Sequence, residues 1–266
     1  MRNHAQWNWF HVCADARRQK LRIPVPRLRA DRLLVERGLF ESRAKAQAAI
    51  EAGLVFANGI AVRKASEEIA GDAELSANAP HPYVSRGGVK LAAALDHFSI
   101  DPNGRVCLDV GASTGGFTQV LVERGARRVY AVDVGTAQLH ESLRKRPEIV
   151  SLEQTDIRTI SRAMFDEAPS IVSIDVSFIS LKHVLPAATV LTAREAMLVA
   201  LIKPQFEAGR DKVKKGVVRD SGVHTAVCDD IVAAVAALRW IIRGVIPSPI
   251  AGGEGNAEFL LAAEKR

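Results

Sequence analysis

Cysteines and long apolar runs are scarce in this chain, and both scarcities exclude whole classes of protein. The 266 residues include only Cys13, Cys107 and Cys228, which are too few and too scattered for a disulfide framework or a zinc site. No apolar run approaches the roughly 18 residues that span a bilayer, and the N-terminus has no apolar signal-peptide core. We therefore expect a cytoplasmic protein that binds neither metal nor membrane.

Excess charge is missing from most of the chain but not from its beginning. Residues 1–90 hold 15 lysines and arginines against nine acidic residues, whereas residues 91–266 hold 21 of each. A basic module joined to a neutral one predicts that the first part binds a polyanion and the second does something else. A solubilising surface without a partner is the alternative.

The basic part contains the signals of one small module. Residues 1–27 have no periodic pattern and are expected to form a flexible leader. From about Arg29, "ADRLLVERG" and "ESRAKAQAAIEAG" predict two short helices, the second with Ser42 as its N-cap. In "VFANGIAV", Asn58-Gly59 between two β-prone triplets predicts a hairpin. We place this module at residues 28–79.

The stretch "RADRLLVERGLFESRAKAQAAIEAGLVFANGIAV" resembles the S4 domain, a small RNA-binding domain first seen in a ribosomal protein. The resemblance implies that the second helix and the adjoining turn contact structured RNA, mainly through its backbone and shape. The alternative for each of these side chains is that it lies on a solvated helix face and contacts no RNA. The residues expected to face RNA are Arg29, Arg32, Arg43, Lys45, Gln47, Arg63, Lys64 and, beyond this module, Arg86.

The rest of the chain alternates between strand and helix signals. Residues 80–88, rich in proline and glycine, are predicted to be a linker, and residues 89–266 a second domain. Strands are expected at 105–110 and 171–178, among others, and a helix at 136–144. Such alternation predicts an α/β, Rossmann-like fold with a mainly parallel sheet and helices on both faces.

A glycine-rich loop follows the first strand of this domain. It reads Gly-x-x-x-Gly-Gly, unlike the dinucleotide pattern, and lacks the lysine of a Walker loop. An adenosylmethionine-type loop remains, with acids after the next two strands to accept from ribose hydroxyls and the adenine amino group. Another nucleotide is the alternative. The residues expected to bind S-adenosyl-L-methionine are Asp109, Gly111, Ser113, Gly115, Gly116, Phe117, Asp133, Asp156 and Ile157.

Six motifs in order resemble the TlyA family: "YVSRGGVKL", "DVGASTGGFT", "AVDVG", "DVSFISL", "LIKPQFE" and "GNAEF". These are RNA 2′-O-methyltransferases with an S4-like domain before an FtsJ-like methyltransferase domain, and members are also labelled haemolysins. The likeness covers residues 29–264. It implies S-adenosyl-L-methionine as cofactor, a cytidine ribose in ribosomal RNA as methyl acceptor, and ribosomal RNA or ribosomal subunits as partners, with no stable protein partner inferred.

FtsJ-type enzymes use a Lys-Asp-Lys-Glu tetrad, and the resemblance carries it onto Lys90, Asp175, Lys203 and Glu258, with Glu254 and Glu207 as alternatives to Glu258. A ribose hydroxyl is a poor nucleophile, so the protein must align it with the methyl group and help it lose its proton. Lys203 is the predicted base, held by Asp175, while Lys90 and Glu258 position the ribose. Because an unpaired charge beside apolar stretches is costly, we expect the four to pair with one another.

Two rival functions and one loop stay open. The chain could be an RNA-binding ribosome-assembly factor whose methyltransferase fold is silent, or a membrane-lytic haemolysin, although no insertion segment is visible. The basic cluster "GRDKVKKG" at residues 209–216 follows Lys203 closely. It is either a loop that grips substrate phosphates or a solvated loop.

Overall fold

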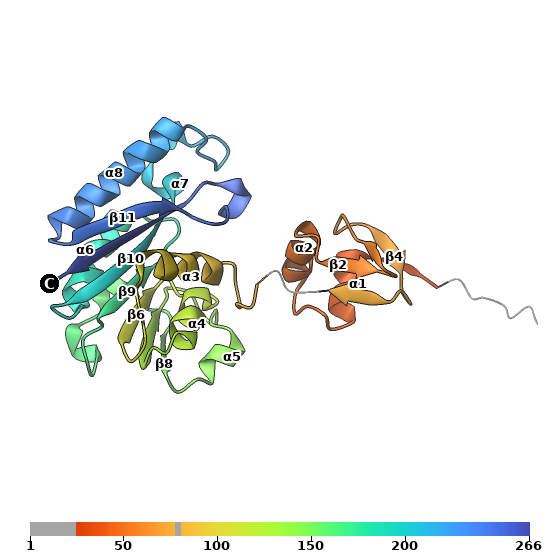
Figure 1. The fold of residues 1–266 in the computed structure, drawn as a ribbon, viewed down its shortest axis with the longest axis horizontal. Coiled ribbons are helices and arrows are strands. Elements are labelled where there is room, and N and C mark those ends of the chain that lie inside the picture. Colours follow the sequence, from red (N-terminus) through yellow and green to blue (C-terminus); the bar gives the residue numbers. More distant parts are fainter. Residues whose placement is uncertain (1–24, 78–80) are drawn as a thin grey trace, which may run out of the picture. The chain divides into compact units, whose positions relative to one another are not determined.

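The computed structural model describes residues 25–77 and 81–266, and the chain divides between Pro80 and His81 into two compact units (Figure 1). Residues 1–24 of the predicted leader lie outside the described residues. Arg27, the last residue of that leader, already belongs to a strand, because it pairs with Ala70.

The first unit is a small α+β module. Ser42 caps the second helix by accepting from the Lys45 backbone N–H, as its sequence position predicts. Asn58 and Gly59 both have positive φ angles, as a two-residue hairpin turn requires. Buried leucine, isoleucine and alanine side chains of both helices form its core. Its elements are β1 (Arg27–Arg29), α1 (Ala30–Glu36), α2 (Arg43–Glu51), β2 (Val55–Ala57), β3 (Ile60–Ala61), β4 (Glu68–Ala70) and β5 (Leu75–Ala77).

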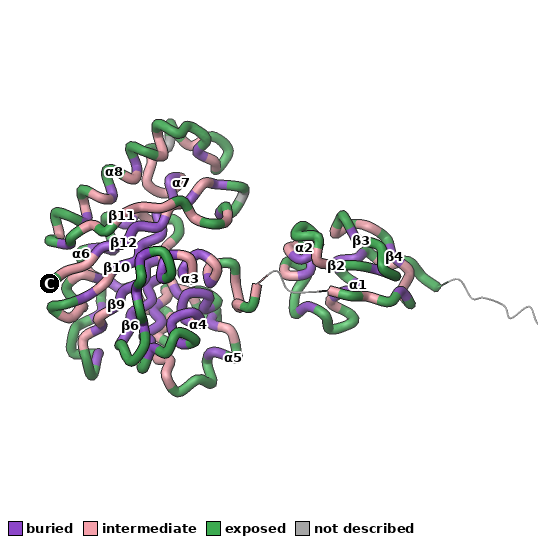
Figure 2. The backbone as a smooth tube through the Cα atoms, in the orientation of Figure 1, coloured by how far each residue is buried: buried purple, intermediate pink, exposed green. Residues whose placement is uncertain are grey.

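The second unit is built on a seven-stranded sheet, as the alternating pattern predicts. The order is β11-β12-β10-β9-β6-β7-β8, and among these strands β12 alone runs in the opposite direction to the rest. The strands are β6 (Val106–Val110), β7 (Arg128–Val132), β8 (Ile149–Leu152), β9 (Ile171–Ile174), β10 (Ala196–Ile202), β11 (Ile241–Pro247) and β12 (Phe259–Lys265). Figure 2 shows that the central strands are buried and form the core of the unit.

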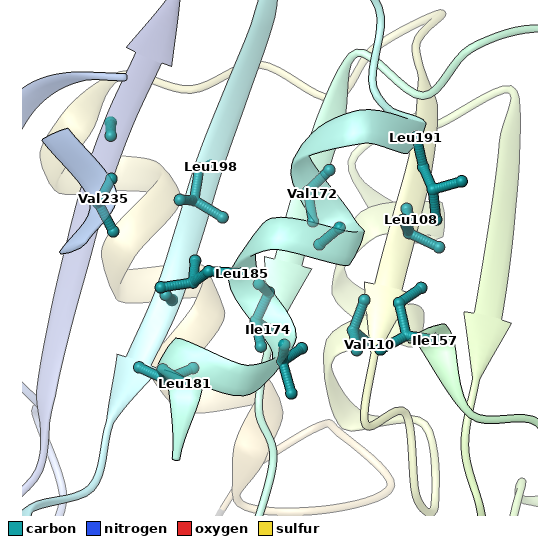
Figure 3. Packing of buried hydrophobic residues seen from close by; sticks show 14 of the residues in the cluster. Leu108, Val110, Ile157, Val172, Ile174, Leu181, Leu185, Leu191, Leu198 and Val235 are labelled. Carbon is teal, nitrogen blue, oxygen red and sulfur yellow. The ribbon is translucent and has the colours of Figure 1, made fainter. Parts of the chain in front are cut away.

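Helices cover both faces of this sheet, which confirms the predicted fold class. On one face, α3 (Gly87–Phe98) and α4 (Gly116–Glu123) bury apolar side chains against alternate residues of the strands. On the other, α6 (Leu181–Leu191) and α8 (Ser221–Ala237) do the same, and Figure 3 shows the α6 leucines over β6, β9 and β10. The short helices are α5 (Glu141–Arg144), α7 (Pro204–Glu207) and the single 3₁₀ turns Ile157–Thr159, Arg162–Met164, Arg210–Lys212 and Gly253–Gly255.

Three predicted boundaries differ from the structure. The helix expected at 136–144 forms only at α5, because the Glu153 carboxylate accepts the backbone N–H groups of residues 137–139. The strand expected at 171–178 ends at Ile174, and Phe178 has a left-handed φ of 64°. Helix α3 begins at Gly87, inside the predicted linker.

Candidate active site

The predicted site residues gather at one edge of the large sheet. Asp133, Asp175 and Lys203 directly follow β7, β9 and β10, and parallel strands bring their carboxyl ends to the same edge. Glu258 directly precedes β12, which is antiparallel, so its start lies at that edge too. The topology therefore brings together residues that are far apart in the sequence.

The four tetrad residues form two ion pairs. Lys203 Nζ lies 2.5 Å from Asp175 Oδ1 and donates to Ser177 Oγ at 2.9 Å. Lys90, on α3, pairs with Glu258 across 168 positions of sequence. Exposure is only 8% for Lys90, 9% for Lys203 and 4% for Glu258, so each charge depends on its partner for compensation.

Both ion pairs border a single cavity of about 520 Å³. Asp175 reaches it through its pairing with Lys203. The charged groups that line the cavity come from both ion pairs. Its lining residues are Lys90, Ser177, Phe178, Lys203, Gln205, Phe206, Gly216, Gly253, Asn256 and Glu258.

An exposed aromatic residue stands at this cavity, and the sequence reasoning missed it. The Phe178 side chain is 91% exposed, although large apolar residues are normally buried. Its ring centroid lies 5.1 Å from that of Phe206, with the planes tilted by 50°. The sequence signal that could have indicated it is its position in "DVSF", three residues after Asp175. In the structure, Phe178 directly follows Ser177, which accepts from Lys203.

Glu207, an alternative to Glu258 in the sequence, instead fixes the loop that carries Asp175 and Phe178. Its carboxylate accepts from Ser180 Oγ at 2.5 Å and from the Leu181 backbone N–H at 2.8 Å. Both bonds tie the end of α7 to the beginning of α6. The loop is thus held at one end by Lys203, which precedes α7, and at the other by Glu207.

The glycine loop offers the features of a nucleoside site. Gly111 and Gly115 have φ angles of 83° and 96°, which only glycine adopts easily. The Asp133 carboxylate accepts from the backbone N–H groups of Ser113 and Gly135, yet each oxygen keeps a second lone pair. Beside it, the apolar Val134 side chain is 72% exposed. A carboxylate next to an open apolar surface suits a ribose and an adenine ring.

Three residues predicted to bind the cofactor have packing roles in the interior of the unit. Asp109 is 0% exposed and accepts from Thr118 and Ser173, so its side chain does not reach the loop surface. Burial raises the pKa of Asp109 to about 7. Phe117 packs in the core, and Gly116 is needed for packing, because a Cβ there would lie 2.9 Å from the Gly88 nitrogen. The side chains of Asp109 and Phe117 therefore face the interior and not the surface of the glycine loop.

Asp156 and Ile157 support the loop after β8. The Asp156 carboxylate binds the Arg158 guanidinium, and this hydrogen bonding lowers the pKa of Asp156 to about 2. Ile157 is 5% exposed and lies in the core cluster. A contact from Asp156 to an adenine amino group would have to share the carboxylate with Arg158.

The basic side chains predicted to face RNA are mostly exposed in the first unit, but many are already paired. Arg29 and Arg43 both bind the buried Asp31 carboxylate and hold the pKa of Asp31 well below its usual range. A shallow hollow of about 380 Å³ brings together Arg29, Gln47, Arg63 and Lys64. The other predicted contacts are Arg32, paired with Glu36, Lys45, paired with Glu41, and Arg86, exposed at the start of α3.

Other chemistries find little support in the described residues. Cys107 is fully buried, and burial raises the pKa of its thiol to about 12, so it is no nucleophile for carbon methylation. Burial likewise raises the pKa of Cys228 to about 11. Cys13 lies outside the described residues. Across residues 25–77 and 81–266, no helix is both long and apolar enough to cross a bilayer.

Comparison with known proteins agrees with this geometry. The FtsJ-like methyltransferase family matches residues 83–265, and the S4 domain matches residues 28–75. The chain is 42% identical to the 16S/23S rRNA (cytidine-2′-O)-methyltransferase TlyA of Mycobacterium tuberculosis, over 88% of this chain and 89% of that protein. It is 39% identical to Hemolysin A of Brachyspira hyodysenteriae, over 88% of this chain and 98% of that one.

A solved structure from Streptococcus thermophilus, titled as a hemolysin, superposes with a TM-score of 0.72. It is 44% identical, over 91% of this chain and 89% of that one. Fold and site together define an enzyme of the FtsJ-like methyltransferase class. With its S4 domain and these relatives, the chain belongs to the TlyA family.

Proposed function

We propose that this protein transfers a methyl group from S-adenosyl-L-methionine to a ribose 2′-oxygen of ribosomal RNA, with a cytidine as the target nucleotide. The observation that carries the proposal is the pairing of Lys203 with Asp175 and of Lys90 with Glu258 around one cavity. The printed names of the relatives support the cytidine and the ribosomal substrate. Ribosomal RNA as substrate places the reaction in the cytoplasm.

Each tetrad residue has a task in this reaction. S-adenosyl-L-methionine supplies an electrophilic methyl group when bound at the Gly111–Gly116 loop, beside Asp133. Lys203 Nζ is the group positioned to accept the proton of the 2′-hydroxyl, and Asp175 stabilises the ammonium that results. Lys90 donates to ribose oxygens from a position fixed by Glu258. Each step uses groups that are already oriented before substrate binds.

The exposed ring of Phe178 gives the target base a place to stack. Extruding a nucleotide from its stack costs a few kcal/mol. Stacking on an aromatic side chain returns about 1–3 kcal/mol per base. With Phe206 beside it, Phe178 offers an apolar surface directly at the cavity that would hold the ribose. Binding of folded RNA by the basic first unit supplies further free energy.

A labelled-methyl transfer assay on ribosomal RNA tests the proposal. Purified protein with radiolabelled S-adenosyl-L-methionine should label the RNA, and the product should contain a nucleotide whose 2′-O-methyl group blocks alkaline cleavage at that site. RNA binding without transfer would instead mean a silent assembly factor. Release of dye from RNA-free liposomes, with no transfer, would mean a lytic protein. Either result overturns the proposal.

A further inference from the structure

We infer that residues 212–219, here called the basic hairpin, bind the phosphates that flank the methylated nucleotide, and that Asn256 fixes this hairpin against the catalytic cavity. The inference rests on the proposed function and assigns to it a second RNA contact, separate from the S4 domain. The ligand class is a single RNA strand with its phosphodiester groups.

The basic hairpin carries a group of uncompensated cations. Lys212, Lys214, Lys215 and Arg219 are exposed, and none forms an ion pair or side-chain hydrogen bond with any residue that the structure describes. Many cations elsewhere in this unit have acidic partners, as Lys182 has in Asp230. The four line a hollow of about 650 Å³. Unpaired cations around a hollow are typical of a phosphate-binding surface.

The acidic residues of the hollow do not cancel this charge. Asp211 and Asp220 also line it, against four cations. The Asp220 carboxylate is occupied in capping α8, where it accepts from the Gly222 backbone N–H at 2.7 Å. The hollow keeps a net positive charge, which favours a polyanion.

The tip of the basic hairpin is a regular two-residue turn, so the backbone positions of its lysines are fixed. Lys214 and Val217 exchange two backbone hydrogen bonds of 3.1 Å. Between them, Lys215 and Gly216 have φ angles of 51° and 77°, as a two-residue hairpin turn requires. Because the backbone of this turn is already ordered, little backbone entropy is lost when the lysines bind a phosphate.

Asn256 connects this turn to the tetrad. Its side chain is 3% exposed, and its amide donates to the Gly216 carbonyl at 3.0 Å and accepts from the Val218 N–H at 3.2 Å. Two residues later, Glu258 pairs with Lys90. Gly216 and Asn256 line the same cavity as that ion pair, so the hairpin is one wall of it.

The position of the basic hairpin beside the cavity determines which part of a bound RNA strand it would contact. A 2′-hydroxyl and its neighbouring 3′-phosphate belong to the same nucleotide, so a ribose seated in the cavity leaves its phosphates at the rim. The basic hairpin is part of that rim. Its cations therefore lie where the strand must pass, and they would hold it while the ribose reacts.

The experiment replaces three of the cations without adding repulsion. The variant K212Q/K214Q/K215Q is compared with R105Q/R194Q/R239Q, which loses the same charge from exposed arginines preceding β6, β10 and β11, at the opposite edge of the sheet. The substrate is ribosomal RNA and the protein is the full chain. Methyl transfer, cofactor affinity and the salt dependence of RNA binding are measured for both variants.

We expect the hairpin variant to raise KM for RNA at least tenfold near 0.1 M salt, with kcat and cofactor affinity within twofold of the unchanged protein. Each lost single-strand phosphate contact lowers the slope of log affinity against log salt by about 0.7, so the slope should fall by about 2. The control variant should change neither quantity. Equal KM and equal slope in the two variants overturn the inference.

Asn256→Asp tests the anchor separately. It removes the two N–H donors and keeps an acceptor for Val218, so the carbonyl groups of Gly216 and Gly253 lose the hydrogen bonds that Asn256 donates to them. KM for RNA should rise in the otherwise unchanged protein, but not further in the K212Q/K214Q/K215Q background. Independent, multiplying effects would contradict the anchoring role. Absence of transfer by the unchanged protein would instead count against the proposed function.

Discussion

Gly111 approaches Asp175 so closely that any Cβ atom at position 111 would overlap the Asp175 carbonyl oxygen. The two residues directly follow the neighbouring strands β6 and β9, whose last residues, Val110 and Ile174, pair with each other. The glycine loop and the predicted catalytic acid are therefore one packed unit. A change at the loop must displace the strand end that positions Asp175.

Gly111→Ala should consequently damage both stability and transfer. Its φ of 83° disfavours alanine, which alone costs about 1 kcal/mol or more, and the overlap with Asp175 adds to this. The control is Gly104→Ala, because Gly104 has a similar φ of 68° and nothing within 4 Å of the added Cβ. Urea unfolding and methyl transfer are measured for both. Equal losses in the two variants would contradict the packed arrangement.

Lys203→Ala should abolish transfer and leave cofactor binding nearly intact. Removing a general base typically slows a reaction by about 10²–10⁴-fold. Single-turnover transfer and calorimetric binding of S-adenosyl-L-methionine separate the two effects, and Lys182→Ala serves as a control for loss of a lysine paired at the surface. Comparable losses of transfer and cofactor affinity would make Lys203 a structural residue.

Phe178→Ala should weaken RNA use without destabilising the fold. Loss of about 1–3 kcal/mol of stacking predicts a 5–150-fold fall in kcat/KM for RNA. The free energy of unfolding should hardly change, because the side chain is 91% exposed. Phe178→Tyr keeps the ring and should retain most activity, whereas the control Val190→Ala removes an apolar side chain of α6 that is 73% exposed. An inactive tyrosine variant would argue against stacking.

Asp109 should make stability fall as pH rises from about 4 to 7. Burial raises its folded-state pKa to about 7, against about 4 in the unfolded chain, so the folded protein binds the extra proton within that window. The free energy of unfolding then decreases by up to about 1.4 kcal/mol per pH unit from this group.

Asp109→Asn removes this contribution and keeps a side chain of similar shape between Thr118 and Ser173. Urea unfolding from pH 5 to 7.5 should show the variant gaining stability relative to the unchanged protein as pH rises. Parallel pH curves for the two proteins would show that Asp109 is ionised in the fold throughout.

Local patterns in the sequence were sufficient for the fold class, whereas the four tetrad residues were named from the resemblance to FtsJ-type enzymes. The alternation of strand and helix signals predicted a mainly parallel sheet. Such signals can be read from the sequence because each depends on residues that are close together along the chain. Asp175, Lys203 and Glu258 stand at strand ends on one edge of the sheet, whereas Lys90 comes from helix α3. Their assembly at one edge followed from the topology.

What depended on distant residues could not be predicted in this way. The helix expected at 136–144 is shortened by Glu153, which takes its backbone donors from beyond the segment. Asp109 has the sequence context of a ligand contact, but Thr118 and Ser173 hold it in the interior. Phe178 became part of the site because its strand ends at Ile174 and leaves the ring exposed.

The sequence by itself determined which residues carry charge, glycine and apolar periodicity, and hence the two modules and the chemistry available. Only the tertiary structure decided which charges neutralise each other: Lys203 with Asp175, Lys90 with Glu258, and Arg43 with Asp31. It also decided that the cations of the basic hairpin have no such partner within the part of the chain that the structure describes. The physical reason is that ion pairing and burial depend on distances in space, which the linear order of residues does not contain.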